Sequence, residues 1–293
     1  MKFEHSLVEI HGAVLLFGLA GLFGKWLSFS PVIIVLGRVF FASLALALVL
    51  YLSGQSLNIK PSKNYFFLFL LGALLAVHWI SFFHSIQVST VAIGLLSFAS
   101  YPVFTAFLEP LFFKEKLIKL NIIYAFLCLV GIFLIVPSFK LENTVSRGVL
   151  WGIFSGITFA VLTILNRKFS QLYSSLAIAF YQDLAATLFL LPFIFLIEYS
   201  LTSKDIILLA LLGIFCTAAA HSLFIKGMRR VRAQTASIIH SLEPFYGIIL
   251  AFFFLHETPS LRTIGGGLLV VTAALAASLS SSSDQPKFRT HKR

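Results

Sequence analysis

Ten long apolar runs follow one another along the 293-residue chain, with only short polar connections between them. They cover approximately residues 6–26, 31–52, 64–85, 89–113, 120–137, 146–166, 174–197, 205–228, 233–254 and 260–280. A helix of about 20 apolar residues crosses the hydrocarbon core of a bilayer, whereas strand barrels show short segments of alternating polarity. The pattern therefore predicts an all-α polytopic membrane protein with ten transmembrane helices.

The chain also contains a repeat. Pro102, in Tyr101-Pro102-Val103-Phe104, precedes Glu115 by 13 residues, and Pro244, in Glu243-Pro244-Phe245-Tyr246, precedes Glu257 by the same distance. The two copies are 142 residues apart, and five predicted helices fall in each half. An odd number of crossings inverts the second copy, which is the construction plan of many carriers. We expect a first repeat at 6–137, an inverted second repeat at 146–280 and a basic disordered tail at 281–293.

Composition agrees with a membrane protein, since 59% of the residues are hydrophobic and only 11% are charged, against about 25% charged in soluble domains. The formal net charge of +11 follows from membrane topology. With a cytoplasmic N-terminus, sixteen Lys and Arg residues fall inside and five outside, which is a strong positive-inside bias. The outside set is Lys25, Lys140, Arg147, Lys204 and Arg262. Both termini are thus predicted to be cytoplasmic, and nucleic acid is not expected as a partner.

Short connections leave no room for a catalytic domain outside the membrane, so an enzyme is not expected. The chain carries no nucleotide-binding motif, and no cofactor is expected. His78 and His84 are six residues apart, while metal-binding histidine pairs on a helix need a spacing of four, so no metal site is expected. Cys128 and Cys216 lie within apolar runs and are expected to act as small packing residues.

Charged residues inside the apolar runs are the strongest functional signals. Arg38, Asp183 and Glu243 lie deep within the second, seventh and ninth runs. A charge in hydrocarbon costs roughly 3 kcal/mol or more, so each needs a partner or a water-filled cavity. Glu109 is the fourth charged candidate, and the titratable neighbours are His78, His84, His221 and His240. These groups predict a substrate-binding or coupling site, with a static buried ion pair as the alternative.

Two prolines fall near the middle of the membrane, Pro102 in the fourth run and Pro244 in the ninth. Each removes a backbone donor and is expected to bend its helix. Kinks at one level suggest gating helices beside a central cavity, with a fixed bend as the alternative. His240, Glu243 and either Tyr246 or Gly247 are expected to face the cavity from the ninth helix. The aromatic candidates for stacking on a substrate are Tyr101, Phe104, Tyr181 and Tyr246.

Glycine and glutamate mark expected contacts between helices. Gly152 and Gly156 form a GxxxG in the sixth run, and Gly265 to Gly267 begin the tenth. Small residues let helices approach closely, either as static packing or as gliding surfaces. Glu115 and Glu257 end the fourth and ninth runs and are expected at opposite membrane surfaces, where they cap or pair.

These features together resemble the EamA-type carriers of the drug/metabolite transporter superfamily. The matching stretches are Tyr101–Glu115 with Leu120–Val136, Leu242 to Glu257 with Gly265-Gly266-Gly267, and Gly37-Arg38. The resemblance implies two inverted five-helix halves around a cavity, with the fifth and tenth helices peripheral. Lys114 departs from the family pattern, in which a small residue commonly precedes the glutamate.

The resemblance implies a secondary transporter that moves a small polar metabolite, such as an amino acid or a derivative, across the cell inner membrane by alternating access. Two alternatives are a carrier of S-adenosylmethionine and a carrier of nucleotide-linked metabolites. A third is a flippase that acts on a lipid-linked substrate. Arg38 would pair with a carboxylate, while Glu243 or Asp183 would take an ammonium group or a proton. The expected partners are the substrate, the bilayer and protons, and the chain is expected as a monomer or a homodimer.

Overall fold

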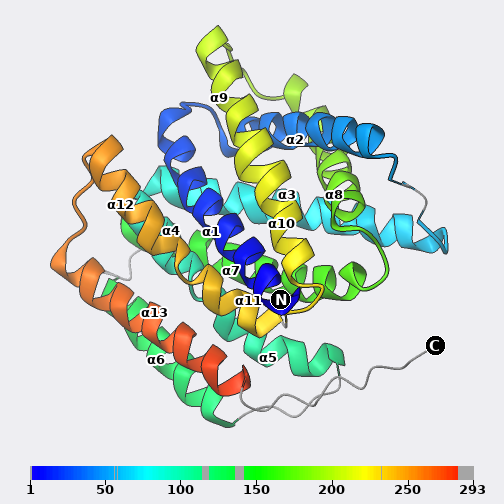
Figure 1. The fold of residues 1–293 in the computed structure, drawn as a ribbon. Helices are drawn as coiled ribbons and strands as arrows, with labels where there is room; N and C mark the ends of the chain where they lie inside the picture. Colours follow the sequence, from blue (N-terminus) through cyan, green and yellow to red (C-terminus); the bar gives the residue numbers. More distant parts are fainter. Residues whose placement is uncertain are drawn as a thin grey trace.

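The fold is entirely helical wherever the structure describes it (Figure 1). The structure is a computed structural model that describes residues 2–55, 57, 59–113, 119–135, 142–231 and 233–282. The elements are α1 (Lys2–Trp26), α2 (Pro31–Ser53), α3 (Lys63–Val88), α4 (Val91–Phe98), α5 (Tyr101–Phe113), α6 (Lys119–Ile135), α7 (Thr144–Ser170), α8 (Ser175–Leu190), η1 (Leu191–Phe195), α9 (Ser203–Gly213), η2 (Ile214–Ala219), α10 (Ala220–Gly227), α11 (Ala233–His240), α12 (Glu243–Leu255) and α13 (Leu261–Ser282).

Most predicted spans coincide with these helices. Seven helical stretches are long and apolar enough to cross a membrane: Glu4–Trp26, Pro31–Ser53, Lys63–Val88, Val91–Phe113, Thr144–Ser170, Ser175–Phe195 and Ser203–Gly227. Shorter apolar helices at Ile122–Ile135, Glu243–Leu255 and Leu261–Ala273 fall in the other predicted segments. The prediction of a polytopic helical membrane protein is therefore confirmed. Helix α13 runs two residues into the expected tail, whose remainder lies outside the described residues.

The two prolines of the internal repeat, Pro102 and Pro244, lie at breaks between helices and not at bends within them as the sequence predicted. Pro102 is the second residue of α5 and Pro244 the second residue of α12, and two residues separate each of these helices from the preceding helix. Proline is well tolerated in a first turn, where its missing N–H would have no partner in any case. Ser100 Oγ donates to Ser97 O at 2.7 Å, and Ser241 Oγ donates to Ser237 O at 3.0 Å. Carbonyls released at each break thus regain a donor, as apolar surroundings require.

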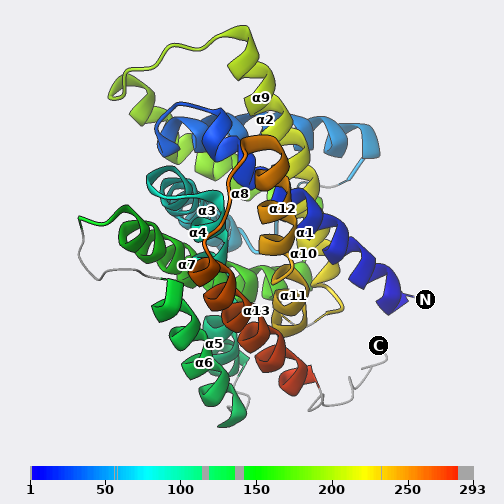
Figure 2. The ribbon, with the colours of Figure 1, turned by 90° about the vertical axis from the view of Figure 1, so that its left-hand side faces the viewer.

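Helices α6 and α13 lie side by side at one edge of the molecule, as Figures 1 and 2 show. A Cβ atom on Gly266 would lie 2.5 Å from Gly131 O, so the two backbones meet where neither residue has a side chain. Their buried residues form an apolar cluster separate from the main core. Close approach also occurs at Gly152, where a Cβ would lie 2.5 Å from Ser97 Cβ. The close approach expected at Gly152, Gly266 and Gly267 is present, whereas a Cβ on Gly265 would have nothing within 4 Å.

The main core lies between two groups of helices. Helix α1 packs against α10 and α12, while α3 packs against α7 and α8. Glu257 Oε2 accepts a hydrogen bond from Val91 N at 2.9 Å, so this carboxylate caps the start of α4 as expected for an interfacial residue. Its counterpart Glu115, with Lys114, lies outside the described residues. The space enclosed by these groups is where the intramembrane charges meet.

Candidate functional site

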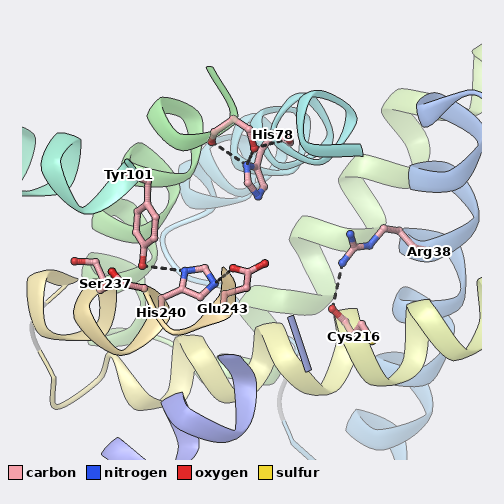
Figure 3. A network of polar contacts seen from close by, with 9 residues as sticks. Arg38, His78, Tyr101, Cys216, Ser237, His240 and Glu243 are labelled. Atoms are coloured by element: carbon pink, nitrogen blue, oxygen red, sulfur yellow. Dashed lines mark hydrogen bonds and ion pairs between the residues drawn. The ribbon is translucent and has the colours of Figure 1, made fainter. Parts of the chain in front are cut away.

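A small central cavity gathers polar side chains from five helices, α2, α3, α10, α11 and α12. It is lined by Phe17, Ala20, Arg38, Leu75, His78, Trp79, Phe82, Phe98, Phe159, His221, His240 and Glu243. Its volume is about 20 Å³, room for about one water molecule. We call this space the central cavity. Figure 3 shows Arg38 across from the His240–Glu243 pair, with His78 on a third side.

Tyr101, His240 and Glu243 form a continuous chain of polar contacts beside the central cavity (Figure 3). The Tyr101 hydroxyl lies 2.9 Å from His240 Nδ1, and His240 Nε2 lies 2.7 Å from Glu243 Oε2. His240 Nε2 and Glu243 Oε2 are at ion-pairing distance without the angles of a hydrogen bond. The direction of the hydrogen bond between Tyr101 and His240 follows the tautomer of the imidazole ring. The break between α11 and α12 places His240 and Glu243 at adjoining helix ends, facing the same space.

Aromatic rings surround His240 on several sides. The ring centroids of Phe17, Phe159 and Phe224 lie 5.2, 5.0 and 5.2 Å from that of His240. Phe98 stacks on Tyr101 at 5.2 Å with an interplanar angle of 16°. Electrostatic interactions are strengthened in such apolar surroundings because water does not screen them. The polar chain is therefore held rigidly, and any charge that enters it interacts strongly.

Arg38 faces the cavity from α2. Its Nε donates to Thr217 Oγ1 at 2.9 Å and an Nη donates to Cys216 O at 3.1 Å. The guanidinium lies 3.9 Å above the Trp79 ring centroid, a cation–π contact. Gly213 permits this arrangement, since a Cβ there would lie 2.6 Å from Arg38 O. The close approach of α2 and α9 thus brings Arg38 to η2, a π-helical turn.

Asp183 is fully buried on α8, in electrostatic range of Arg38. Neither of its carboxylate oxygens has a hydrogen-bond partner among the described residues. Its neighbour Gln182 donates to Asn166 Oδ1 at 2.6 Å. A buried carboxylate without donors is costly and is often found at functional sites.

His78 is anchored from the other side of the cavity. Its Nδ1 lies 3.0 Å from Ser155 O and 2.9 Å from Ser155 Oγ, on α7. Its ring centroid lies 4.8 Å from that of Phe159. The imidazole orientation is thus fixed by α7, leaving its other edge toward the aromatic residues of the central cavity.

The structure brings most of the predicted site residues together. Arg38, His78, His240 and Glu243 line the central cavity, and Tyr101 and Asp183 contact or face these groups. Tyr181 lies elsewhere, with its hydroxyl donating to Leu57 O at 2.8 Å. Tyr246 packs against α1. A Cβ atom added to Gly18 of that helix would lie only 2.8 Å from the Cβ of Tyr246. Phe104 does not line the central cavity either.

Several residues that contact the site were not among the residues predicted from the sequence. Trp79, Phe159 and Thr217 contact Arg38 or His78, yet nothing distinguishes them from packing residues in the sequence. His221 was among the predicted titratable neighbours, and it lies 143 residues after His78, one more than the offset of the prolines. Both histidines line the central cavity. In the described part of the chain, no three His, Cys, Asp or Glu side chains are grouped as a metal would need.

Comparison with known proteins decides the family. The sequence model of the EamA-like transporter family matches residues 8–136 and again residues 146–279. The chain belongs to the EamA-like transporter family. Members of this family that it resembles are transporters and not enzymes, as the sequence predicted.

Relatives of this EamA-like chain include both uncharacterized and named transporters. The uncharacterized transporter YxxF of Bacillus subtilis is 26% identical over 280 residues, covering 94% of this chain and 89% of the relative. An S-adenosylmethionine uptake transporter of Rickettsia felis is 26% identical over 240 residues, covering 81% and 79%. A chain of known crystal structure has the same fold, with a TM-score of 0.70 at 16% identity over 94% of this chain and 97% of that one.

Proposed function

We propose that this chain is a secondary transporter that moves a small polar metabolite, an amino acid or a derivative of one, by alternating access through the central cavity. The observation that carries the proposal is the buried chain Tyr101–His240–Glu243 facing Arg38 across that cavity. An acidic and a basic group on opposite sides of one apolar space suit a substrate with both an ammonium and a carboxylate group.

Each charged group has a proposed role. Arg38 pairs with the substrate carboxylate, because its planar guanidinium can donate two parallel hydrogen bonds. Glu243 takes the ammonium group or a coupling proton, and His240 holds the carboxylate in place through Nε2. Asp183 is the second candidate for the proton, since its buried oxygens have no donors among the described residues.

The proposed architecture has ten spans in two inverted halves, residues 6–137 and 146–280, with both termini in the cytoplasm and the chain in the cell inner membrane. Two observations support it. The paired breaks before Pro102 and Pro244 repeat at one offset, and the family model matches each half separately. The distribution of Lys and Arg supports the orientation.

Transport requires the central cavity to widen. At about 20 Å³ it accommodates roughly one water molecule, far less than a metabolite. The structure therefore corresponds to a closed state under this proposal. The broken helices α4–α5 and α11–α12 are the proposed moving parts, since Pro102 and Pro244 leave each pair of half-helices joined by only two residues.

S-adenosylmethionine is the first individual candidate substrate. It carries a carboxylate, an amine, a sulfonium and a flat purine. The aromatic lining of the cavity suits a cation and a flat ring, and Glu243 suits a positive charge. The Rickettsia felis relative is named for uptake of this compound.

Counterflow into proteoliposomes tests the function. Liposomes preloaded with S-adenosylmethionine, or with one amino acid at a time, should take up the labelled compound only when the protein is present. Glu243→Gln keeps the shape of the side chain and removes its charge. We expect it to abolish uptake, or to abolish the change in uptake between about pH 5.5 and about pH 8, the range in which an ordinary imidazole changes its charge.

A matched variant separates a functional loss from a folding loss. Glu198→Gln makes the same chemical change at an exposed position between α8 and α9 and should leave uptake intact. Both variants should elute as folded protein. Normal uptake with normal pH dependence in Glu243→Gln would contradict the assignment of Glu243.

A further inference from the structure

A second, larger cavity lies between α2, α8 and α10, apart from the central cavity. Its volume is about 640 Å³, in the range of small-molecule sites. It is lined by Ala45, Leu46, Val49, Gln55, Ser170, Ser174, Ser175, Leu176, Ile214, Ala218, Ala219, Ser222, Leu223, Ile225, Lys226 and Arg229. We call it the lateral crevice. Neither the polar chain nor Arg38 belongs to its lining.

The lateral crevice opens on the lipid-facing surface. Val49 and Ile214 stand at its walls and are 44% and 39% exposed. Leu44 and Leu48, on the same helix as Val49, are 52% and 58% exposed. In a membrane protein, such apolar surface is covered by acyl chains. The crevice wall is thus continuous with the surface that lipid covers.

One end of the crevice is basic. Lys226 and Arg229, both exposed, line it where α10 ends. Lys226 Nζ lies 2.7 Å from Glu9 Oε1, so its charge is partly neutralised. The described residues provide no carboxylate within ion-pairing distance of the Arg229 guanidinium. Its charge therefore remains available to an anion at this end.

Two further features of the crevice suit an anion: the Ser222 hydroxyl and the N-terminus of α8. The Ser222 hydroxyl lines the crevice, is 93% buried and has no hydrogen-bond partner among the described residues. Helix α8 begins at Ser175 in the crevice wall, and Ser174 Oγ satisfies only the N–H of Ala177. The other first-turn N–H groups and the positive end of the helix dipole attract negative charge.

We propose that the lateral crevice binds an anionic phospholipid. One acyl chain lies along the apolar wall formed by Ala45, Val49 and Leu223, and the phosphate reaches Arg229 and the start of α8. Apolar walls that open to the bilayer, with a basic end, match an amphipathic anion and not a soluble metabolite. The leaflet is the cytoplasmic one under the orientation proposed above. Binding itself does not depend on transport.

Native mass spectrometry of the full-length protein tests the proposal. Protein in detergent micelles is mixed with phosphatidylglycerol or with phosphatidylcholine of the same acyl chains. We expect one phosphatidylglycerol to be retained in preference to phosphatidylcholine. Arg229→Gln should lower its retention about five-fold, the contribution of one basic residue near an anionic headgroup.

Two controls keep the result specific. Arg230→Gln makes the same charge change at the next residue, which does not line the crevice, and should retain phosphatidylglycerol. Ala45→Trp fills the wall and should reduce retention, whereas Leu48→Trp faces lipid on the same helix and should not. Equal retention of both lipids, or equal effects of the two arginine variants, would overturn the proposal. Lost transport in Arg229→Gln with unchanged lipid retention would also overturn it, because the crevice would then belong to the substrate path.

Discussion

At the scale of single residues, the central cavity is built from groups that fix one another. Glu243 is held by His240, and His240 is held by Tyr101, so one phenol orients a carboxylate two contacts away. Tyr101 is fully buried and stacked on Phe98, which leaves its hydroxyl few other directions. The position of the Glu243 carboxylate thus depends on Tyr101.

Tyr101→Phe tests this dependence. The change removes one buried hydrogen bond and should lower the free energy of unfolding by about 1–2 kcal/mol. It should also weaken substrate binding, because His240 is no longer held in one orientation. Tyr246→Phe makes the same chemical change on α12, away from the central cavity, and is the matched control. Thermal unfolding in detergent and counterflow rates measure the two effects. Equal behaviour of both variants would remove Tyr101 from the site.

At the scale of helices, close contacts set where the charged groups stand. Helices α3 and α8 meet at Gly72, where a Cβ would lie 2.5 Å from both Ala185 Cβ and Gln182 O. His78 follows Gly72 on α3, and Asp183 lies at the same contact on α8. The spacing between these two groups therefore depends on a position without a side chain.

Gly72→Ala should force α3 and α8 apart. Overpacking of this kind costs about 1–3 kcal/mol, since neither Ala185 Cβ nor the Gln182 carbonyl can move away freely. Gly265→Ala is the control, because a Cβ on Gly265 would have nothing within 4 Å. We expect a lower melting temperature for Gly72→Ala and no decrease for Gly265→Ala. A melting temperature unchanged in Gly72→Ala would mean that the contact is looser than the structure indicates.

The sequence predicted the helices well because a long apolar run is a strong signal for a membrane-spanning helix. It also identified the charged residues of the central cavity, because a charged residue is rare within such a run. It misplaced Tyr246 for a physical reason. We assigned it to the face of His240 and Glu243 from spacing alone. Tyr246 lies almost one turn beyond Glu243 on α12, where Gly18 lets α1 approach closely, so its side chain packs against α1 and not at the central cavity. Trp79 and Thr217 were missed because their roles arise only when α2, α3 and η2 come together.

At the scale of the whole molecule, polar contacts hold the helices together toward both ends of α1. Near its C-terminal end, Lys25 Nζ donates to Ser89 O at 2.7 Å. Toward its N-terminal end, Glu9 pairs with Lys226. A further pair, Glu109 with Arg167, joins α5 to α7. Under the proposed function, opening to either side breaks one of these sets and keeps the other.

Cysteine labelling tests whether the centre opens. Ala20 lines the central cavity and is 3% exposed, so Ala20→Cys should react with a membrane-impermeant thiol reagent only when the cavity widens. Ala273→Cys, equally buried between α13 and α6, should stay unreactive. Both are made after Cys128 and Cys216 are replaced by alanine. We expect Ala20→Cys to be labelled slowly, and we expect added substrate to lower the labelling rate further. An unreactive Ala20→Cys in active protein would exclude a path through the central cavity.

The π-helical turn η2 has a consequence for how this chain can vary. A π turn holds one residue more than the α-helical path it replaces. Deleting one residue between Ile214 and Ala219 would let an α-helix form there, and the residues after it would keep their direction because the π turn already takes up the extra residue. His221 would stay at the central cavity and Ser222 at the lateral crevice. The contacts disturbed would be local, those of Thr217 Oγ1 and Cys216 O with Arg38, so a single lost codon in this stretch would release the arginine and leave the helix beyond it in place.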